Sequence, residues 1–284
     1  MAGRKSPRNL SRTEHLRIRC SLSGRTIGAM TSSPPDHVVG RVSATLRALS
    51  AYRDGASTSQ LARRCGLARP TVHRLLSALA AEGYVDRDRQ SGRWYLGPEL
   101  YLLGEAAAPR YDVTQQARAS VHRLAAATGE SAFFSARRGD ETVCLVREDG
   151  DFPIRSFVLY EGARFPLGVV SAGLVVLSML PDREVGEYLS TVDLTAEWGP
   201  AHDTSQIRGR IARTREDGYS TNPGLVVEGS WGMAAAVFTP SGEPAWALTL
   251  TGVESRFRAE RRAELGALLL KEAHALTNVL RSPS

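Results

Sequence analysis

From residue 38 onward, apolar residues recur with the period of an α-helix. Val38, Val42, Leu46 and Leu49 lie at i, i+4, i+8 and i+11, which is the stripe of an amphipathic helix. Asp54-Gly55 follows, and this pair favours a turn over continued helix. The spacing therefore predicts a helix that begins near Val38 and ends before Asp54.

A second, short helix is predicted over residues 60–65. Ser57, Thr58 and Ser59 offer hydroxyls that can cap its N-terminus. Gly66 suits its end, because glycine adopts the left-handed conformation at helix C-termini without a steric penalty. We therefore expect a short capped helix that leads directly into a turn.

A third helix is predicted after a turn over residues 67–69. Pro70 suits its first position, where a missing N–H costs nothing, and Gly83 marks its end. The side chains expected to face inward are Val72, Leu75, Leu76 and Leu79. Two helices joined by a tight turn form a helix-turn-helix, whose second helix enters the major groove of DNA. The alternative is a small three-helix domain without a DNA-binding role.

A basic hairpin is predicted directly after the third helix. Residues 84–87 and 93–96 have the character of strands, and residues 88–92 form a turn between them. Such a hairpin is a wing, whose arginines can reach phosphate or an adjacent minor groove. The candidate DNA contacts are Ser59, Gln60, Arg69, Pro70, Thr71, His73, Arg74, Arg87, Arg89 and Arg93. For His73, a surface position that only packs is the alternative.

Residues 98–108 contain a short helical repeat of Leu100, Leu103 and Ala107, which Pro109 ends. This pattern predicts a linker helix. It either contributes to dimerisation or serves as a spacer, and the two roles are compatible.

From Asp112 the pattern changes to strands mixed with helices. A helix is expected from Val113 to Gly129. Further helices are predicted over 171–179, 182–190, 205–217 and 258–280, the first of them buried. Strands are predicted over 131–137, 142–147, 154–159, 233–239 and 245–251. Strands mixed with helices at the ends indicate an α+β domain built on an antiparallel sheet.

The charge of the chain is distributed unevenly. Its 284 residues carry a formal charge of +6. Residues 1–35 hold seven basic side chains and one acid, residues 36–97 hold ten and five, and residues 98–284 hold nineteen and twenty-four. A basic first third suggests that this part alone meets phosphate. Residues 1–36 lack apolar periodicity, so we expect a disordered basic tail, and a translation start at Met30 instead of Met1 stays open.

Composition argues against several classes of protein. Hydrophobic residues make up 42% and charged residues 23%, as in ordinary globular domains. No apolar run approaches the roughly 18 to 20 residues of a membrane span. There is no apolar core of a secretory signal, and three distant cysteines favour a reducing compartment, so we expect a cytoplasmic protein without a membrane partner. No nucleophile elbow, Walker A loop or metal-ligand histidine spacing occurs, so we expect no enzyme, no metal and no cofactor.

These residues also carry a family resemblance. The run from Gln60 to Leu79, then Glu82-Gly-Tyr-Val and Tyr95-Leu-Gly-Pro, resembles the DNA-binding domain of the IclR family of bacterial transcriptional regulators. Weaker matches, including Ser171-Ala-Gly and Leu248-Thr-Leu-Thr-Gly, resemble the GAF-like effector domain of that family. The expected domains are a tail over 1–36, a winged helix-turn-helix over 37–98, a linker helix over 99–111 and a GAF-like effector-binding domain over 112–284.

The resemblance implies that the C-terminal domain binds a small molecule, often an organic or aromatic acid. Carried over by spacing, the ligand residues are Ser171, Ala172, Asn222, Gly232, Thr249 and Thr251. N–H groups at the start of the buried helix favour a carboxylate. Thr249 and Thr251 present their hydroxyls on one face of a strand.

The chain departs from the family pattern near these positions. The departures are Gly168-Val169-Val170 for a usual His-Ala-Thr/Ser, Leu174 for a lysine, Asn222 for a frequent Asp and Gly232 for a frequent Cys. Trp231 and the run 225–227 add apolar surface, which favours a ligand larger or more apolar than a small keto acid. Phe133 and Phe134 lie on a strand that could line the pocket, but these two residues and Trp231 each fit ordinary core better.

We therefore predict a ligand-responsive, DNA-binding transcriptional regulator, repressor or activator. Its expected partners are a double-stranded DNA operator, a small-molecule effector and further copies of itself in a dimer or tetramer. The alternative is a DNA-binding domain fused to a catalytic small-molecule domain. The effector and the operator sequence stay open.

Overall fold

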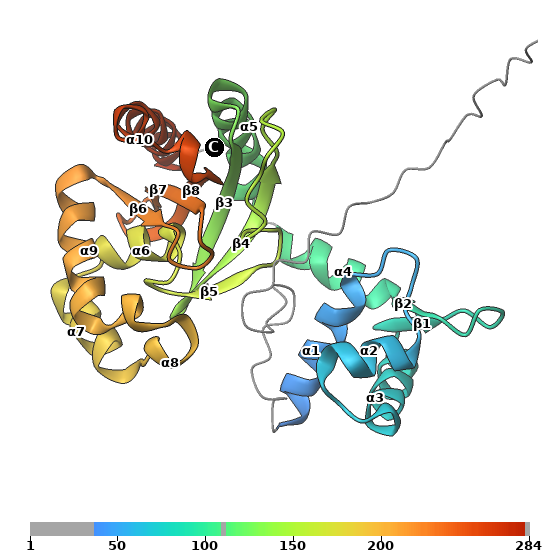
Figure 1. Cartoon of the computed structure of the whole chain (residues 1–284). Helices are drawn as coiled ribbons and strands as arrows, with labels where there is room; N and C mark the ends of the chain where they lie inside the picture. Colours follow the sequence, from blue (N-terminus) through green and yellow to red (C-terminus); the bar gives the residue numbers. More distant parts are fainter. Residues whose placement is uncertain (1–36, 109–111, 282–284) are drawn as a thin grey trace, which may run out of the picture. The chain divides into compact units, whose positions relative to one another are not determined.

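The computed structural model describes residues 37–108 and 112–281, which divide into two compact units between Leu100 and Tyr101 (Figure 1). The tail predicted over 1–36 and the last part of the predicted linker, 109–111, lie outside the described residues. None of the helices in the described ranges combines the length and the apolar character that a membrane crossing requires.

Three helices and a two-stranded hairpin form the N-terminal unit. They are α1 (Val38–Ser50), α2 (Thr58–Cys65), α3 (Arg69–Ala81), β1 (Val85–Arg87) and β2 (Trp94–Leu96). The buried core that joins them includes Leu49, Leu61, Val72, Leu76, Val85 and Trp94. The three predicted helices and the hairpin are confirmed, but Val38 is exposed at the start of α1 and takes no part in the core.

The turn between α2 and α3 is shorter than predicted. Helix α3 begins at Arg69 with Ala68 as its N-cap, so Pro70 occupies the second helical position and not the first. Both positions lie in the first turn, where the backbone N–H has no partner within the helix and proline is tolerated. Gly66 ends α2 in the left-handed conformation, as expected. The predicted linker helix is α4 (Pro98–Ala107).

A six-stranded antiparallel sheet in the order β5-β4-β3-β8-β7-β6 organises the C-terminal unit. The strands are β3 (Ser131–Arg138), β4 (Glu141–Glu148), β5 (Arg164–Pro166), β6 (Tyr219–Pro223), β7 (Ser230–Phe238) and β8 (Pro244–Val253). The helices are α5 (Val113–Thr128), α6 (Ser171–Ser178), α7 (Asp182–Thr191), α8 (Thr195–Trp198), α9 (Thr204–Asp217) and α10 (Ala259–Arg281), with short 3₁₀ turns at Pro200–His202 and Glu254–Arg256. The predicted α+β class is confirmed.

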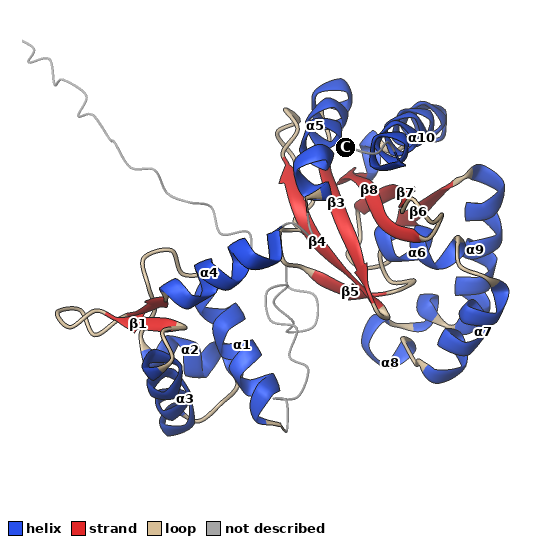
Figure 2. Ribbon diagram, turned by 180° about the vertical axis from the view of Figure 1, so that it is seen from behind, coloured by secondary structure: helices blue, strands red, loops and turns tan. Residues whose placement is uncertain are grey.

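The two faces of this sheet carry separate cores. Helices α5 and α10 lie on one face and α6 lies on the other (Figure 2). Side chains alternate along a strand, so Phe133 packs in the core beneath α6 and Phe134 packs in the core beneath α5 and α10. Both rings are fully buried, which confirms the prediction that they are core residues.

Two parts of the predicted sheet are wrong. Residues 154–159 form an irregular loop and not a strand, although they are rich in apolar residues. The edge of β4 is instead taken by β5, in which Phe165 pairs with Thr142. Residues 219–223, which were not among the predicted strands, form the edge strand β6 beside β7. The short helix α8 was not predicted, because four residues carry too little periodicity to be recognised.

Candidate DNA-binding face and ligand pocket

The orientation of α3 is set by the caps of the helix before it. The Ser57 backbone N–H donates to Gln60 Oε1 at 2.9 Å, while the Gln60 N–H donates to Ser57 Oγ at 3.3 Å, which is a capping box. Gln60, a predicted DNA contact, therefore uses its side-chain oxygen inside the unit, whereas the neighbouring Ser59 is exposed. The cap and Gly66 together fix where α3 begins.

The basic start of α3 points away from the core. Arg69, Pro70, His73 and Arg74 are exposed and Thr71 is half-buried, while Val72 and Leu76 of the same helix are buried. The predicted contacts of this helix therefore lie together on one accessible face. The His73 ring also packs edge-on against Trp94, with 6.2 Å between the ring centroids.

The three arginines of the wing differ in the contacts that they make within the N-terminal unit. The guanidinium of Arg87 lies over the ring of Trp94 at 5.3 Å, and Arg89 is exposed in the turn. Nη1 of Arg93 donates to the carbonyl of Gly55 at 2.8 Å, so this arginine ties the wing to the loop after α1. The backbone N–H of Ser91 donates to the carboxylate of Asp88, and this bond lowers the pKa of that carboxyl.

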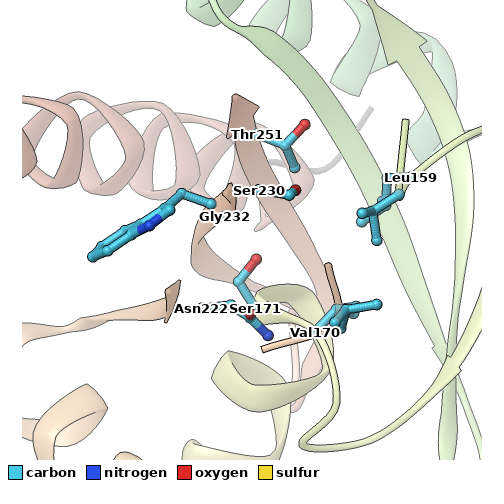
Figure 3. A pocket seen from close by; sticks show the side chains of 10 residues that line it. Leu159, Val170, Ser171, Asn222, Ser230, Gly232 and Thr251 are labelled. Atoms are coloured by element: carbon cyan, nitrogen blue, oxygen red, sulfur yellow. The ribbon is translucent and has the colours of Figure 1, made fainter. Parts of the chain in front are cut away.

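A pocket in the C-terminal unit opens between the start of α6, strands β6, β7 and β8, and the loop after β4 (Figure 3). The empty space within it, counted together with open solvent at its mouth, is about 280 Å³. Ten described residues line it, and none of them carries a charge: Val158, Leu159, Val170, Ser171, Asn222, Val226, Ser230, Trp231, Gly232 and Thr251. Four of the six predicted ligand residues therefore line one pocket, namely Ser171, Asn222, Gly232 and Thr251.

Thr249 and Thr251 lie on the same face of β8, but only one of them lines the pocket. Thr251 is part of the lining, and Thr249, two residues before it in the strand, is not. Both are buried, 4% and 0% exposed, and neither hydroxyl has a hydrogen-bond partner among the described residues. A buried polar atom without a partner costs free energy, so these hydroxyls are candidates for bonds with a bound molecule.

Both the nitrogen and the oxygen of the Asn222 amide already form hydrogen bonds within the C-terminal unit. Its Nδ2 donates to the carbonyl of Val169 at 2.7 Å, and its Oδ1 accepts the N–H of Leu225 at 3.1 Å. Asn222 therefore holds the segment before α6 against the loop after β6. Ala172 is buried beside the pocket but does not line it.

Gly232 leaves space next to the first residue of α6. A Cβ at this position would lie 2.9 Å from Ser171 Oγ, closer than a normal contact. The glycine is not needed for its backbone, because its φ lies outside the left-handed region. Its role is therefore to keep this part of the pocket open.

Three lining residues were missed by the sequence analysis: Val158, Leu159 and Ser230. The first two lie in the loop that was predicted as a strand. Ser230 Oγ lies 2.6 Å from Ser156 Oγ, and this bond holds the loop over the pocket. Trp231 lines the pocket and is also stacked on Phe257, so it contributes both to the pocket wall and to the packing. No local sequence pattern shows that a loop will fold over a distant strand end.

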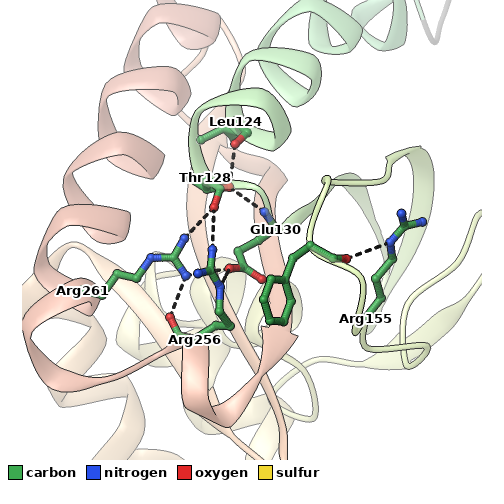
Figure 4. Close-up of polar contacts among 7 residues, drawn as sticks. Leu124, Thr128, Glu130, Arg155, Arg256 and Arg261 are labelled. Atoms are coloured by element: carbon green, nitrogen blue, oxygen red, sulfur yellow. Dashed lines mark hydrogen bonds and ion pairs between the residues drawn. The ribbon is translucent and has the colours of Figure 1, made fainter.

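A buried ion-pair cluster joins Glu130, directly before β3, to helix α10 (Figure 4). Glu130, only 2% exposed, accepts hydrogen bonds from Arg256 Nε at 2.7 Å and from Arg261 Nη1 at 2.6 Å. Arg256 also covers the ring of Phe152 at 4.5 Å, which anchors the beginning of the pocket loop. A Cβ at Gly252 would collide with Glu130 Oε2 and with the ring of Phe257, so any larger residue there would displace the ion pair. The cluster positions the end of β8 and the loop.

Among the described residues, no three His, Cys, Asp or Glu side chains are grouped as a metal site would require. The pocket lining likewise contains only neutral side chains. The pocket wall combines hydroxyl and amide groups with apolar side chains.

Comparison with known proteins covers both units. One curated relative is the HTH-type transcriptional regulator BhcR of Paracoccus denitrificans, which is 28% identical over 81% of this chain and 82% of BhcR. Another is the HTH-type transcriptional repressor AllR of Salmonella typhi, which is 27% identical over 84% of this chain and 87% of AllR. An IclR transcriptional regulator of Alicyclobacillus acidocaldarius is 26% identical, with a TM-score of 0.68 over 85% of this chain and 98% of that one. An IclR homologue of Microbacterium hydrocarbonoxydans, solved with 4-hydroxybenzoate, shares the fold at 22% identity. Its TM-score is 0.69, over 86% of this chain and 98% of the homologue.

Family models match both parts of the chain. The IclR helix-turn-helix domain matches residues 38–89, and the bacterial transcriptional regulator IclR C-terminal domain matches residues 105–278. Because the second match alone covers more than half of the 284 residues, this protein belongs to the IclR family of transcriptional regulators, which join a DNA-binding helix-turn-helix to an effector-binding domain.

Proposed function

We propose that the chain is a homo-oligomeric cytoplasmic regulator whose operator affinity depends on a small organic acid. Helix α3 enters the major groove with Arg69, Thr71 and Arg74, and the wing arginines contact the DNA backbone. The pocket beneath the start of α6 binds the effector. Regulation is allosteric if the effector binds the operator-bound and free forms with different affinity.

The observation that carries the effector proposal is the buried, unpartnered hydroxyl of Thr251 in the pocket wall. The first residue of α6, Ser171, lines the same pocket, and Val170 before it supplies no side-chain cap. Uncapped N–H groups and the positive end of the helix dipole favour an anion there. A carboxylate between α6 and Thr251 would satisfy both elements.

The rest of the lining favours a single polar group on an apolar body. Val158, Leu159, Val226 and Trp231 offer no hydrogen bond for a second carboxylate, and no charged residue lines the pocket to offset one. We therefore favour a monocarboxylate with an aromatic or aliphatic body over a dicarboxylate. The 4-hydroxybenzoate bound by the Microbacterium hydrocarbonoxydans homologue has this chemistry and makes a suitable probe.

Binding without turnover is the expected activity. A general base or nucleophile needs a titratable partner within hydrogen-bond reach, and the pocket lining of Ser, Thr, Asn and apolar side chains offers none. The curated relatives named above are regulators as well.

The test separates the two threonines. Titration of benzoate and 4-hydroxybenzoate by calorimetry should show Thr251→Val losing about 0.5 to 1.5 kcal/mol of binding, or 1.5 to 3 if the bond is charge-assisted. Thr249→Val should lose less, because Thr249 lies outside the lining, and the double variant should lose most. Valine is nearly isosteric and removes an unpartnered hydroxyl, so thermal stability and operator affinity without ligand should be retained. Undiminished affinity in the double variant would place the site elsewhere.

A further inference from the structure

A second group of unpartnered polar atoms lies outside the effector pocket, around α9. Arg210 is buried, 8% exposed, and its Nη1 donates to the carbonyl of Ala201 at 2.7 Å. Its Nε and Nη2 are buried and have no hydrogen-bond partner in the part of the chain that the structure describes. A buried guanidinium with two nitrogens that lack acceptors is strongly unfavourable, so its retention points to a partner that is not a described side chain.

The two unpartnered nitrogens form one edge of the guanidinium. Because the group is planar, the N–H of Nε and one N–H of Nη2 point in parallel, on the side away from the Nη1–Ala201 bond. This fork matches the two oxygens of a carboxylate or a phosphate. A halide or a single carbonyl oxygen can only bridge the two donors with bent hydrogen bonds, which are weaker than two parallel ones. The edge therefore selects for an oxyanion.

The charged neighbours of Arg210 do not supply this oxyanion. Asp203 is the acid whose charge acts on Arg210, but its Oδ1 accepts the N–H of Gln206 as the cap of α9, at 2.8 Å. The other charge that acts on it, Arg213, is a like charge. Positive charge is therefore in excess at the buried end of Arg210.

A third buried donor belongs to the same corner of the unit. Nε1 of Trp198 also lacks a partner among the described residues. The Trp198 ring lies edge-on to His202 at 6.5 Å, and His202 follows directly on Ala201, which holds Arg210. Nδ1 and Nε2 of His202 face the carbonyls of Trp198 and Val169, at 2.9 and 3.3 Å. This corner therefore holds several buried hydrogen-bond donors, and the carbonyls of Trp198, Val169 and Ala201 already face other nitrogens.

Beside this corner lies a hollow of about 500 Å³, including open solvent, whose lining includes His202, Asp203 and Ile207 but neither Arg210 nor Trp198. Ile207 lies one helical turn before Arg210. The carboxylates of Asp193 and Asp203 also line the hollow, and their charge opposes a multiply charged anion more than a singly charged one. The approach therefore favours a small monocarboxylate over a phosphate.

The geometry points to a second ligand site in this protein: the Nε–Nη2 edge of Arg210 binds a small oxyanion, preferably a monocarboxylate, apart from the effector pocket. The site uses α8, the turn at Pro200–His202 and α9, whereas the effector pocket uses α6 and β6 to β8. The two sites can therefore be tested independently.

The experiment follows the thermal unfolding of the full chain in sodium acetate, sodium phosphate and sodium chloride at equal ionic strength. Acetate should raise Tm in a saturable way, and chloride should not. Arg210→Lys keeps the charge but loses the fork, and Arg210→Met loses both, so both variants should lose the acetate effect. Arg208→Met, which removes an exposed arginine of the same helix that does not act on Arg210, is the matched control and should retain it.

Acetate could also enter the effector pocket, so the titration is repeated in the Thr249→Val, Thr251→Val variant, where the effect should persist. Stabilisation by phosphate alone would support the site but change its ligand to a tetrahedral oxyanion. No acetate or phosphate effect on the unmodified chain, or an equal effect in Arg210→Lys, would overturn the proposal.

A measurement on the unmodified chain keeps the proposal testable if the Arg210 variants do not fold. Crystals grown in acetate should show a planar ligand on the Nε–Nη2 edge at high resolution. A bare edge, or a single water there, would overturn the assignment.

Discussion

At the scale of single residues, the shape of the pocket depends on the absence of a side chain at position 232. Gly232→Ala would place a Cβ 2.9 Å from Ser171 Oγ and push that hydroxyl into the ligand space. We expect ligand affinity to fall by about 1 to 3 kcal/mol, the usual cost of overpacking, with little change in the free protein because the serine can rotate. Calorimetry with 4-hydroxybenzoate measures this loss. Adding Ser171→Gly should recover part of it, and unchanged affinity in Gly232→Ala would contradict the steric role.

His202 makes stability depend on pH. Burial lowers the pKa of this histidine below its ordinary 6.5, so the unfolded chain binds the proton first as the pH falls. The contribution of the neutral His202 imidazole to the free energy of unfolding is therefore fully present above pH 6.5. It is lost as the pH falls from 6.5 through the lowered pKa of His202 in the folded protein. Urea unfolding of His202→Gln at several pH values should show a shallower loss on acidification. His274→Gln, at an exposed position, is the control, and an unchanged slope in His202→Gln would contradict the assignment.

At the scale of elements, α2 and its caps decide what α3 can present. Because the capping box and Gly66 fix the turn, Arg69 and Arg74 lie on one exposed face at the start of α3. We expect Arg69→Ala or Arg74→Ala to weaken operator binding by about 1 to 3 kcal/mol if the arginine contacts a base, with relaxed specificity at that base. A phosphate contact would instead weaken binding to all sequences equally.

Gel-shift titration against the operator and against unrelated DNA distinguishes the two cases. Arg47→Ala removes an exposed arginine from α1 and should have a smaller effect. If both α3 variants bind as tightly as the unmodified chain, α3 does not enter the groove.

At the scale of the whole molecule, one winged helix has too small a footprint for a specific site, and two-fold symmetry usually doubles it. Helix α4 offers an apolar surface for this purpose, because Tyr101, Leu102 and Leu103 are 69%, 57% and 51% exposed. Light scattering at micromolar concentration should show at least a dimer. Leu102→Asp with Leu103→Asp should lower the oligomeric state and the operator affinity together, whereas Glu105→Ala on the same helix should change neither. A monomer on and off DNA would contradict the proposed assembly.

Elements whose signals are local could be predicted from the amino-acid sequence. The stop at Gly66, the cap at Ser57 and the periodicity of α10 depend on neighbours within a few residues, so the helix-turn-helix and the long closing helix could be predicted closely. Strand alternation also placed Thr249 and Thr251 on one face, because side-chain direction along a strand has a fixed period of two.

Tertiary structure decided everything that depends on which segments meet. Residues 154–159 are apolar enough for a strand, but β5 occupies the edge of β4, so they fold over the pocket instead and bring Val158 and Leu159 to it. The sequence could not show that the Asn222 amide would be used internally, or that two nitrogens of Arg210 would be buried without an acceptor among the described residues. Hydrogen-bond partners and burial are set by packing between distant segments, for which a local pattern carries no signal.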